Sequence, residues 1–424
     1  MLWLMGLLPL GLLILGFPFF LVLLATATIA IVFYTSVPPT AVLQIMFGSV
    51  GQFALLAVPF FIFAGELMGR GGMARRLVAV VIALFGGIRG SVPITTVGAT
   101  ALYGSISGST AATVAALGPL FYPRLRKSGY DEKFSTGVIT CAGYLDNIIP
   151  PSIAMILYCA AAEQSVIKLF AAGFIPGLVL AGIMALYIYV YARWKNLDRG
   201  RRFHWTEFVT ALREGAWAIM MPVIVFGGLY GGVFSPTEAA GVACVYAIFV
   251  TMFVHREIGW REFWDVSINS MYLTAQIFLI VAVAGAFSWL LITSGTATAA
   301  VDLIAHLKLS AWQVLLTINV FLLIVGCFID TASAILVLTP LLLPMALAVG
   351  VDPIHFGIIV VTNLSIGTFT PPFGINIFVA QSIFGVPLRS IYAGVAPFIA
   401  VAIVGLMIVT YVPWLSLVLV RYIG

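Results

Sequence analysis

Long apolar runs, separated by short polar stretches, follow one another through almost the whole chain. A helix needs about 20 apolar residues to cross the hydrocarbon core of a bilayer. By this measure we expect spanning helices at 2–33, 53–68, 73–88, 169–191, 216–234, 239–254, 270–292 and 390–419. The first run is longer than one span, which predicts a tilted or kinked helix with its kink at Pro18. Two mixed polar and apolar segments, 203–215 and the one that begins at Gly259, are typical of helices that lie along the membrane surface.

Two further runs are too long for one untilted helix and carry a polar stretch in the middle. They are 91–122 and 311–348, with polar stretches at 104–110 and 327–333. This pattern predicts two re-entrant hairpins, each with its tip inside the membrane. Irregular backbone survives at that depth only where protein or a water-filled cavity satisfies its polar groups, so the tips predict a binding site.

Two more runs, 134–160 and 354–384, are interrupted by proline pairs. The pairs are Pro150-Pro151 and Pro371-Pro372. Proline lacks an amide donor and fixes φ, so neither helix can close over its interruption. We therefore expect two spanning helices that unwind near the middle of the membrane.

The interrupted segments occur twice in the chain at one constant separation. Ser109-Thr110-Ala111 recurs in the second half as Asp330-Thr331-Ala332, and Pro150-Pro151 recurs at the same offset as Pro371-Pro372. The separation holds without a gap over about 70 residues, which indicates an internal repeat of the kind found in secondary transporters. We expect a first inverted repeat at 1–192 and a second at 216–424, joined by a basic cytoplasmic loop and an interfacial helix at 193–215.

The composition of the chain is typical of a membrane protein. Of 424 residues, 62% are hydrophobic and 8% are charged, whereas soluble domains carry about 25% charged residues. The sequence therefore predicts an all-α polytopic membrane protein surrounded by lipid, and the net charge of +5 is no sign of nucleic-acid binding. No basic residue precedes Arg70, so we expect no cleaved signal peptide. The four Cys lack CxxC spacing and are expected to be small buried side chains.

The interruptions supply oxygen atoms and free helix ends. Helix N-termini suit a carboxylate, and hydroxyls and unwound carbonyls suit a cation such as sodium. The first hairpin offers Ser107, Ser109 and Thr110, and the second offers Asp330, Thr331 and Ser333. The first broken helix offers Asp146, Asn147 and Ser152, and the second offers Thr368, Thr370 and Asn376.

Blander interpretations of these residues stay open. Small Ser and Thr side chains also allow helices to pack closely in membranes. Asp330 is a candidate ligand for sodium or a proton, and equally a candidate N-cap for the helix that follows. Three carboxylates near predicted span ends, Glu66, Glu163 and Glu238, are expected to be solvated at the interface.

An intramembrane enzyme is the rival class. The string GSISGST contains Ser-Gly but not the GxSG order of a rhomboid-like serine protease. The four His lie at or near predicted loops, where none can act as a base inside a span, and no HExxH pair occurs. We therefore expect no enzymatic activity.

Long motifs in the chain resemble one family. The motifs are SGSTAATVAALGPLFYPRLRKSGYDEKFSTGVITCAGYLDNIIPPSI at 107–153, KLFAAGFIPGLVLA, FSPTEAAGVACVYA and VGVDPIHFGIIVVTNLSIGTFTPPFGIN. They closely resemble the large membrane subunit, DctM type, of tripartite ATP-independent periplasmic (TRAP) transporters, and the resemblance covers nearly the whole chain. It implies an elevator-type transporter, in which a transport domain of hairpins and broken helices moves within a scaffold.

The resemblance also implies a function and partners. It implies sodium-coupled import of an organic anion, such as a C4-dicarboxylate or sialic acid, across the bacterial inner membrane. Sodium ions act as coupling ions, and no cofactor is implied. The partners would be a small four-helix membrane subunit of DctQ type, expected on a separate chain, and a periplasmic substrate-binding protein. The alternative is a stand-alone sodium or proton:organic-anion symporter that needs no binding protein, and a passive channel is a third reading.

Carried over by motif, the resemblance gives the cation-binding candidates, and the other polar residues at the breaks are expected to bind the substrate. The cation-binding candidates are Ser107, Ser109, Thr110, Asp330, Thr331 and Thr370. The substrate-binding candidates are Asp146, Asn147, Ser152, Thr368 and Asn376, beside the helix breaks at Pro150, Pro151, Pro371 and Pro372.

One departure from the family pattern concerns Asp146. Where the family commonly has a Gly-rich approach to the Pro-Pro-Ser motif, this chain has Tyr144-Leu145-Asp146-Asn147. If Asp146 faces the substrate, a dicarboxylate is disfavoured and a cationic or hydroxyl-rich ligand is favoured. If it faces the cation site or solvent, the family expectation stands.

Overall fold

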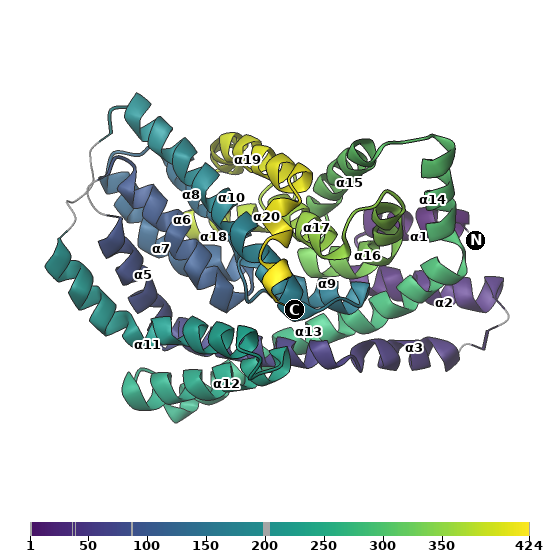
Figure 1. Cartoon of the computed structure of the whole chain (residues 1–424), viewed down its shortest axis with the longest axis horizontal. Coiled ribbons are helices and arrows are strands. Elements are labelled where there is room, and N and C mark those ends of the chain that lie inside the picture. Colours follow the sequence, from purple (N-terminus) through teal and green to yellow (C-terminus); the bar gives the residue numbers. More distant parts are fainter. Residues whose placement is uncertain (1, 36, 39, 86–87, 198–203, 424) are drawn as a thin grey trace.

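The computed structural model describes residues 2–35, 37–38, 40–85, 88–197 and 204–423, and these residues form helices and the segments between them (Figure 1). Seven helices of the described chain are long and apolar enough to cross a membrane. They are Phe53–Arg70, Val166–Trp194, Trp205–Tyr230, Pro236–Val254, Trp260–Thr293, Thr331–Ala348 and Leu388–Tyr411. The prediction of an all-α polytopic membrane protein is confirmed.

Both expected hairpins are present. The first consists of α6 (Ser91–Ser107) and α7 (Thr110–Lys127), and the second of α15 (Ala311–Gly326) and α16 (Thr331–Ala348). The two arms of each hairpin pack against each other. At the first tip Gly108 has φ of +65°, and a Cβ there would lie 2.7 Å from Cδ1 of Ile153. The left-handed backbone conformation therefore favours glycine, whereas the contact with the end of the Ile153 side chain could be relieved by a small shift of that side chain.

Both expected broken helices are also present. The first runs from α8 (Glu132–Ala142) through the 3-10 turn η2 (Gly143–Asn147) and an irregular stretch to α9 (Ile153–Ala162). The second runs from α17 (Pro353–Gly367) to α18 (Ile375–Phe384). The Pro150-Pro151 and Pro371-Pro372 peptide bonds lie inside these breaks, and both are cis.

The corresponding segments of the two repeats pack reciprocally. Helix α7 packs against α18, and its counterpart α16 packs against α9. Helix α8 packs against α19 (Leu388–Tyr411), and its counterpart α17 packs against α10 (Val166–Trp194). Each hairpin thus ends against the broken helix of the other repeat. This reciprocal packing brings the two hairpin tips and the two breaks into one region.

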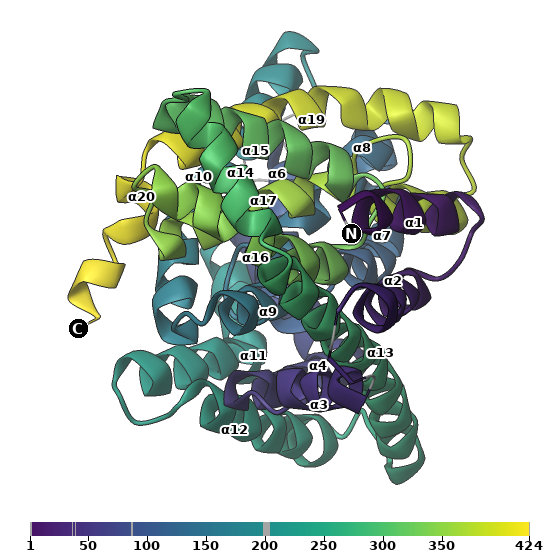
Figure 2. The same cartoon turned by 90° about the vertical axis from the view of Figure 1, so that its right-hand side faces the viewer.

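A second group of helices lies along one side of the hairpins and broken helices and is here called the frame. It comprises α3 (Thr40–Val50), α4 (Ala57–Arg70), α11 (Trp205–Tyr230), α12 (Pro236–Ile248) and α13 (Trp260–Thr293). Figures 1 and 2 show these helices together in the lower part of the molecule. Helix α13 packs against α3 and α4 within the frame and against α16 of the second hairpin, so it links the two groups.

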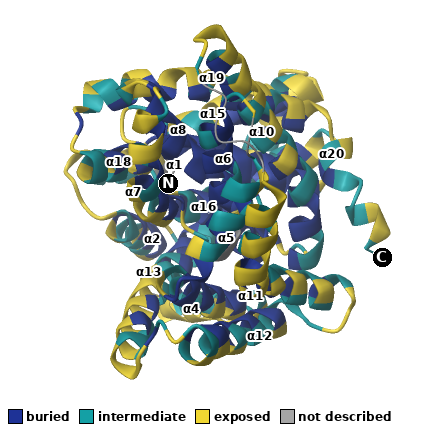
Figure 3. Cartoon of the chain, turned by 90° about the vertical axis from the view of Figure 1, so that its left-hand side faces the viewer, coloured by how far each residue is buried: buried dark blue, intermediate teal, exposed yellow. Residues whose placement is uncertain are grey.

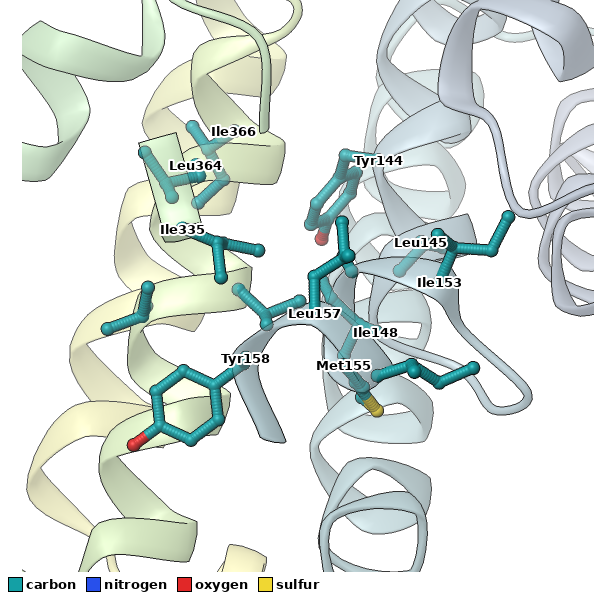
Figure 4. Packing of buried hydrophobic residues seen from close by; sticks show 14 of the residues in the cluster. Tyr144, Leu145, Ile148, Ile153, Met155, Leu157, Tyr158, Ile335, Leu364 and Ile366 are labelled. Carbon is teal, nitrogen blue, oxygen red and sulfur yellow. The ribbon is translucent and has the colours of Figure 1, made fainter. Parts of the chain in front are cut away.

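The core is centred on the broken helices. All residues from Phe134 to Ala142 in α8 and from Ile354 to Gly367 in α17 are buried. The frame, in contrast, has many exposed apolar side chains, and Figure 3 shows exposed residues along α11 and α12. Figure 4 shows side chains of the first break and α9, such as Leu157, facing Ile335 of α16 and Leu364 of α17. A helix that is apolar on all sides is stable only when it is surrounded by protein or lipid. The breaks are therefore held inside densely packed protein.

Four details of the predicted elements are wrong. Residues 2–33 form two helices that pack together, α1 (Leu2–Ile14) and α2 (Phe19–Tyr34), because Gly16 adopts φ of +82° and Pro18 begins a new helix rather than kinking one. The expected interfacial segment 203–215 is continuous with the next span in α11, where Gly215 packs against Val80 of α5 (Met73–Leu84).

The segment from Gly259 is likewise continuous with 270–292, in the single 34-residue helix α13. Helices α3 and α14 (Thr296–His306) were not expected. Each has 11 residues, fewer than a span needs, and each lies between two segments that the sequence predicts to lie in the membrane. Arg199, Arg201 and Arg202 of the expected basic loop lie outside the described residues. The limits of the two repeats and of the cytoplasmic loop stay predictions.

Candidate functional site

A cavity of about 500 Å³ lies where the four interruptions meet. Residues from both hairpin tips and both broken helices line it, namely Ser107, Ser109, Thr110, Asn147, Asp330, Thr331 and Thr368. Helices α4 and α13 of the frame close the other side with Glu66, Arg70, Leu273 and Ile277. The expectation that the interruptions converge on one pocket is confirmed.

Four helices begin at this cavity. Their first residues, or residues of their first turns, line its wall: Thr110 in α7, Ile153 in α9, Thr331 in α16 and Ile375 in α18. A helix N-terminus carries partial positive charge and amide groups without intrahelical partners. The helix ends therefore favour an anion, whereas the charged side chains among the described lining residues are two carboxylates, Glu66 and Asp330, and one basic group, Arg70.

The first tip is ordered by its own polar side chains. Oγ of Ser109 caps α7 by accepting a hydrogen bond from the amide of Ala112 at 3.4 Å. Oγ1 of Thr110 donates to Oδ1 of Asn376 at 3.0 Å, which ties the first tip to the second broken helix. Ser109 is exposed and lines the cavity, so it combines a capping role with access to a ligand.

Asp330 occupies the corresponding position of the second tip. Its Oδ2 accepts a hydrogen bond from the amide of Ser333 at 3.0 Å and caps α16. The N-cap interpretation of Asp330 is therefore confirmed, and a carboxylate that caps a helix keeps free lone pairs for a cation. The side chain is exposed on the cavity wall. Beside it, the buried hydroxyl of Thr331 has no hydrogen-bond partner among the described residues.

Asn376 joins the two breaks from behind the cavity. It is fully buried, and its Nδ2 donates to Oγ1 of Thr368 at 3.2 Å and to the carbonyl of Thr140 at 3.4 Å. With the bond from Thr110, its amide contacts three separate elements. The sequence placed Asn376 at the substrate, but the structure places it where it positions Thr110 and Thr368, which do line the cavity.

Two other candidates lie away from the cavity. Oγ of Ser152 donates to the carbonyl of Asn147 at 2.7 Å and accepts from the amide of Met155, so it shapes the first break and caps α9. Oγ1 of Thr370 donates to the carbonyl of Ile366 at 2.7 Å. Neither side chain belongs to the lining of the cavity.

The position of Asp146 resolves the question raised by the sequence. Its side chain is fully buried and is absent from the cavity wall. It packs against the backbone of Gly104 in α6, where even a Cβ would collide with it. Asp146 therefore faces neither this cavity nor solvent.

The sequence missed the charged pair on the frame. Nε of Arg70 lies 3.4 Å from Oε2 of Glu66 one helical turn earlier, and both residues line the cavity. The expectation that Glu66 is only solvated at a span end is therefore wrong. The i, i+4 spacing of the two charges was visible in the sequence, but only tertiary packing places this face of α4 against the hairpin tips.

A second cavity, of about 700 Å³, lies farther along the same helices. Residues such as Leu157 in α9 line the first cavity, and Ala160 and Ala161 line the second. Helix α13 likewise contributes Leu273 and Ile277 to the first and Val281 to the second. The two cavities therefore follow one another along the contact between the frame and the hairpin and broken-helix unit.

Comparison with known proteins gives one consistent result. Residues 5–415 match the family model described as "Tripartite ATP-independent periplasmic transporter, DctM component". The chain is 41% identical over 379 residues to the C4-dicarboxylate TRAP transporter large permease protein DctM of Pseudomonas aeruginosa, and the alignment covers 89% of each chain. It is 39% identical to the isethionate TRAP transporter permease protein DctMQ of Oleidesulfovibrio alaskensis, covering 95% of this chain and 63% of that one.

The fold also has a solved counterpart. The crystal structure of the YdaH transporter of Alcanivorax borkumensis superposes with a TM-score of 0.67 over 98% of both chains. Sequence identity between the two is 14%, so this likeness concerns the fold alone.

Proposed function

The chain belongs to the DctM component family of TRAP transporters and is a large permease subunit, and we propose that it imports an organic acid together with sodium. The single observation that carries this proposal is the meeting of four helix N-termini at one cavity. The acid group of the substrate would lie against these ends, where free amides and partial positive charge favour an anion. The relatives named for C4-dicarboxylates and isethionate support an organic acid as the substrate class.

Sodium would bind at the two tips. Ser107, Ser109 and Thr110 offer hydroxyls at the first tip, and Asp330 and Thr331 offer a carboxylate and a hydroxyl at the second. Oxygen ligands of this kind suit a hard monovalent cation. A bound cation would also offset the negative charges of Asp330 and Glu66 in a cavity that has to accept an anion. Coupling would follow because each ion favours the binding of the other.

Transport would proceed by an elevator movement. The two cavities lie in succession along α9, α13 and α16, which supports a sliding of the hairpins and broken helices against the frame. The substrate site would then meet the two sides of the membrane in turn. We further propose that the membrane is the bacterial inner membrane.

Two partners complete the proposal. They are a small four-helix membrane subunit of DctQ type and a periplasmic substrate-binding protein. The name of the Oleidesulfovibrio relative, DctMQ, supports an association between large and small components. On this chain, the exposed side chains at the start of α13, among them Trp260, Trp264 and Tyr272, offer an apolar surface on the frame for the small subunit.

The test is reconstitution of the chain with its small subunit and binding protein in proteoliposomes. We expect uptake of an organic acid only with both partners present and an inward sodium gradient. Uptake that is unchanged when choline replaces sodium would refute the coupling. Uptake of free substrate without the binding protein would favour a stand-alone symporter, and flux far above transporter turnover would favour a channel.

A further inference from the structure

The carboxyl group of Asp146 is enclosed by protein in the first break, and the transport cycle proposed above does not use it. The side chain has no exposed surface, and neither carboxyl oxygen has a hydrogen-bond partner of acceptable geometry among the described residues. A buried carboxylate without hydrogen bonds or a counter-charge is strongly destabilising, and ionisable groups inside membranes mark functional sites. Asp146 therefore needs a positive partner.

A second unpaired polar group lies at the same place. The hydroxyl of Thr113, in the helix α7 that packs against η2, lies next to Asp146, and its Oγ1 is also buried without a well-aligned hydrogen-bond partner among the described residues. The Asp146 carboxyl and the Thr113 hydroxyl are thus two neighbouring groups without a well-aligned hydrogen-bond partner. Together they offer part of the oxygen coordination that a small cation needs. Gly104 leaves the space that admits the Asp146 side chain between α6 and the break.

Among the described residues, no basic side chain forms an ion pair with Asp146. Tyr103 of α6 and Glu66 of α4 are titratable groups that line the neighbouring cavity. The other titratable groups near the middle of the packed helices are Tyr144 in η2, whose buried hydroxyl has no hydrogen-bond partner among the described residues, Cys141 in α8, Tyr158 and Cys159 in α9, and His355 in α17. Tyr158 donates to the carbonyl of Pro353, and His355 bonds Ser416 and the carbonyl of Thr410.

We propose that Asp146 and Thr113 form a buried site for a monovalent cation, sodium or a proton, behind the wall of the substrate cavity. Sodium would be held by the carboxylate and by Oγ1 of Thr113. A proton would bind one carboxyl oxygen, and the neutral acid would donate a hydrogen bond to Thr113. Whether it holds sodium or a proton, this site is separate from the proposed sodium ligands at the hairpin tips. Its role in coupling rests on the proposed function.

The experiment uses the full chain, purified with its small subunit, and measures thermal unfolding. Wild type, Asp146→Asn and Thr113→Val are compared in sodium and choline chloride at acid and alkaline pH. Asp302→Asn is the matched control, because it removes a carboxylate from an exposed position on α14. A ligand that binds only the folded state raises the unfolding temperature in proportion to its occupancy.

Two results would support the site and identify the ion. If it holds sodium, the sodium concentration needed for stabilisation rises at least about tenfold in Asp146→Asn, rises less in Thr113→Val, and is unchanged in Asp302→Asn. If it holds a proton, wild type loses stability as pH rises, since the neutral acid must ionise, and Asp146→Asn loses that pH dependence while keeping its response to sodium.

Other results would overturn it. The proposal fails if Asp146→Asn matches wild type in both its sodium response and its pH dependence, or if wild type responds to neither ion. Should Asp146→Asn not assemble, Thr113→Val decides alone, and an unchanged response in that variant refutes the site. Because the readout is binding, failure of sodium-driven uptake by wild type would refute the proposed function without deciding this inference.

Discussion

The two breaks differ at one pair of corresponding positions. Asp146 in the first break and Gly367 in the second are related by the same constant offset as the other repeat pairs. The first break buries a carboxyl group against Gly104, whereas the second presses the Gly367 backbone onto the backbone of Gly326. At the tips the chemistry is reversed, because the first is capped by Ser109 and the second by Asp330.

This difference shows how one duplicated framework supplies two environments for a carboxylate. The second repeat places its acid, Asp330, exposed on the cavity wall. The first places its acid, Asp146, fully buried inside the protein. The two repeats therefore share their backbone geometry but differ in the side chains at corresponding positions. Exchanging residues between these positions distinguishes the effect of a side chain from the effect of the backbone.

We expect the largest effect on stability from replacing Gly367, in the second break, with alanine. In Gly367→Ala the new Cβ would collide with backbone atoms of Gly326, which cannot move as a flexible side chain could. We expect a loss of about 3 kcal/mol of stability, or failure to assemble, because overpacking of rigid interiors is costly. The measurement is thermal unfolding in detergent. Gly241→Ala in α12, where a Cβ meets nothing within 4 Å, is the control and should change stability by less than about 1 kcal/mol.

The second largest effect is expected at Asn376, whose side-chain amide links the two broken helices. Asn376→Leu removes hydrogen bonds to Thr110, Thr368 and Thr140 and leaves buried polar groups unpaired. We expect a loss of about 2 kcal/mol and slower uptake, because the tip and the break lose their alignment. The corresponding position of the first repeat holds Met155, and Met155→Leu should cost less than about 1.5 kcal/mol. Equal losses in the two variants would mean that the amide contributes nothing beyond its volume.

The tips themselves are compared by Asp330→Ala and Ser109→Ala. Both variants lose an N-cap, worth about 1 kcal/mol of stability. We expect the sodium concentration for half-maximal uptake to rise about tenfold for Asp330→Ala and by a few-fold for Ser109→Ala, because a charged ligand interacts more strongly than a hydroxyl. Sodium titration of uptake in proteoliposomes measures this. If neither titration shifts, these side chains are only caps.

The smallest effect is expected at Thr370, whose counterpart in the first break is Ile149. The Thr370 hydroxyl bonds the carbonyl of Ile366 within its own helix end and is not on the cavity wall. Thr370→Ile should therefore change stability by less than about 0.5 kcal/mol and leave the sodium titration unchanged. A clear fall in apparent sodium affinity would restore Thr370 to the set of cation ligands.

The breaks and hairpins could be predicted from the sequence because their signals are local. Proline pairs and runs of Gly, Ser and Thr mark the residues where a helix cannot continue, and their recurrence at a constant offset in the second half indicated that they would meet. Helix continuity was harder to predict. The polar first turns of α11 and α13 resembled separate surface helices, although each continues into a span without a residue that stops it.

The placement of individual side chains depends on packing that no local pattern contains. Glu66 and Arg70 line the cavity because α4 faces the hairpin tips, and Asp146 is buried because Gly104, in an arm of the first hairpin, leaves room for it. The sequence motif around the first break contains Asp146, but it does not reveal that Gly104 of another helix leaves the space for its side chain. For the same reason the sequence predicts Asn376 at the substrate, whereas its side chain lies behind the cavity and links Thr110, Thr368 and Thr140.

The reciprocal packing of α7 on α18 and of α16 on α9 has a consequence for biosynthesis. When the first half of the chain leaves the ribosome, the surfaces against which its hairpin and α9 will rest have not yet been made. Polar backbone at the first tip and first break would then lack its protein partners until α16 and α18 are inserted. We therefore expect the two halves to fold together, and neither half is expected to form a stable permease by itself.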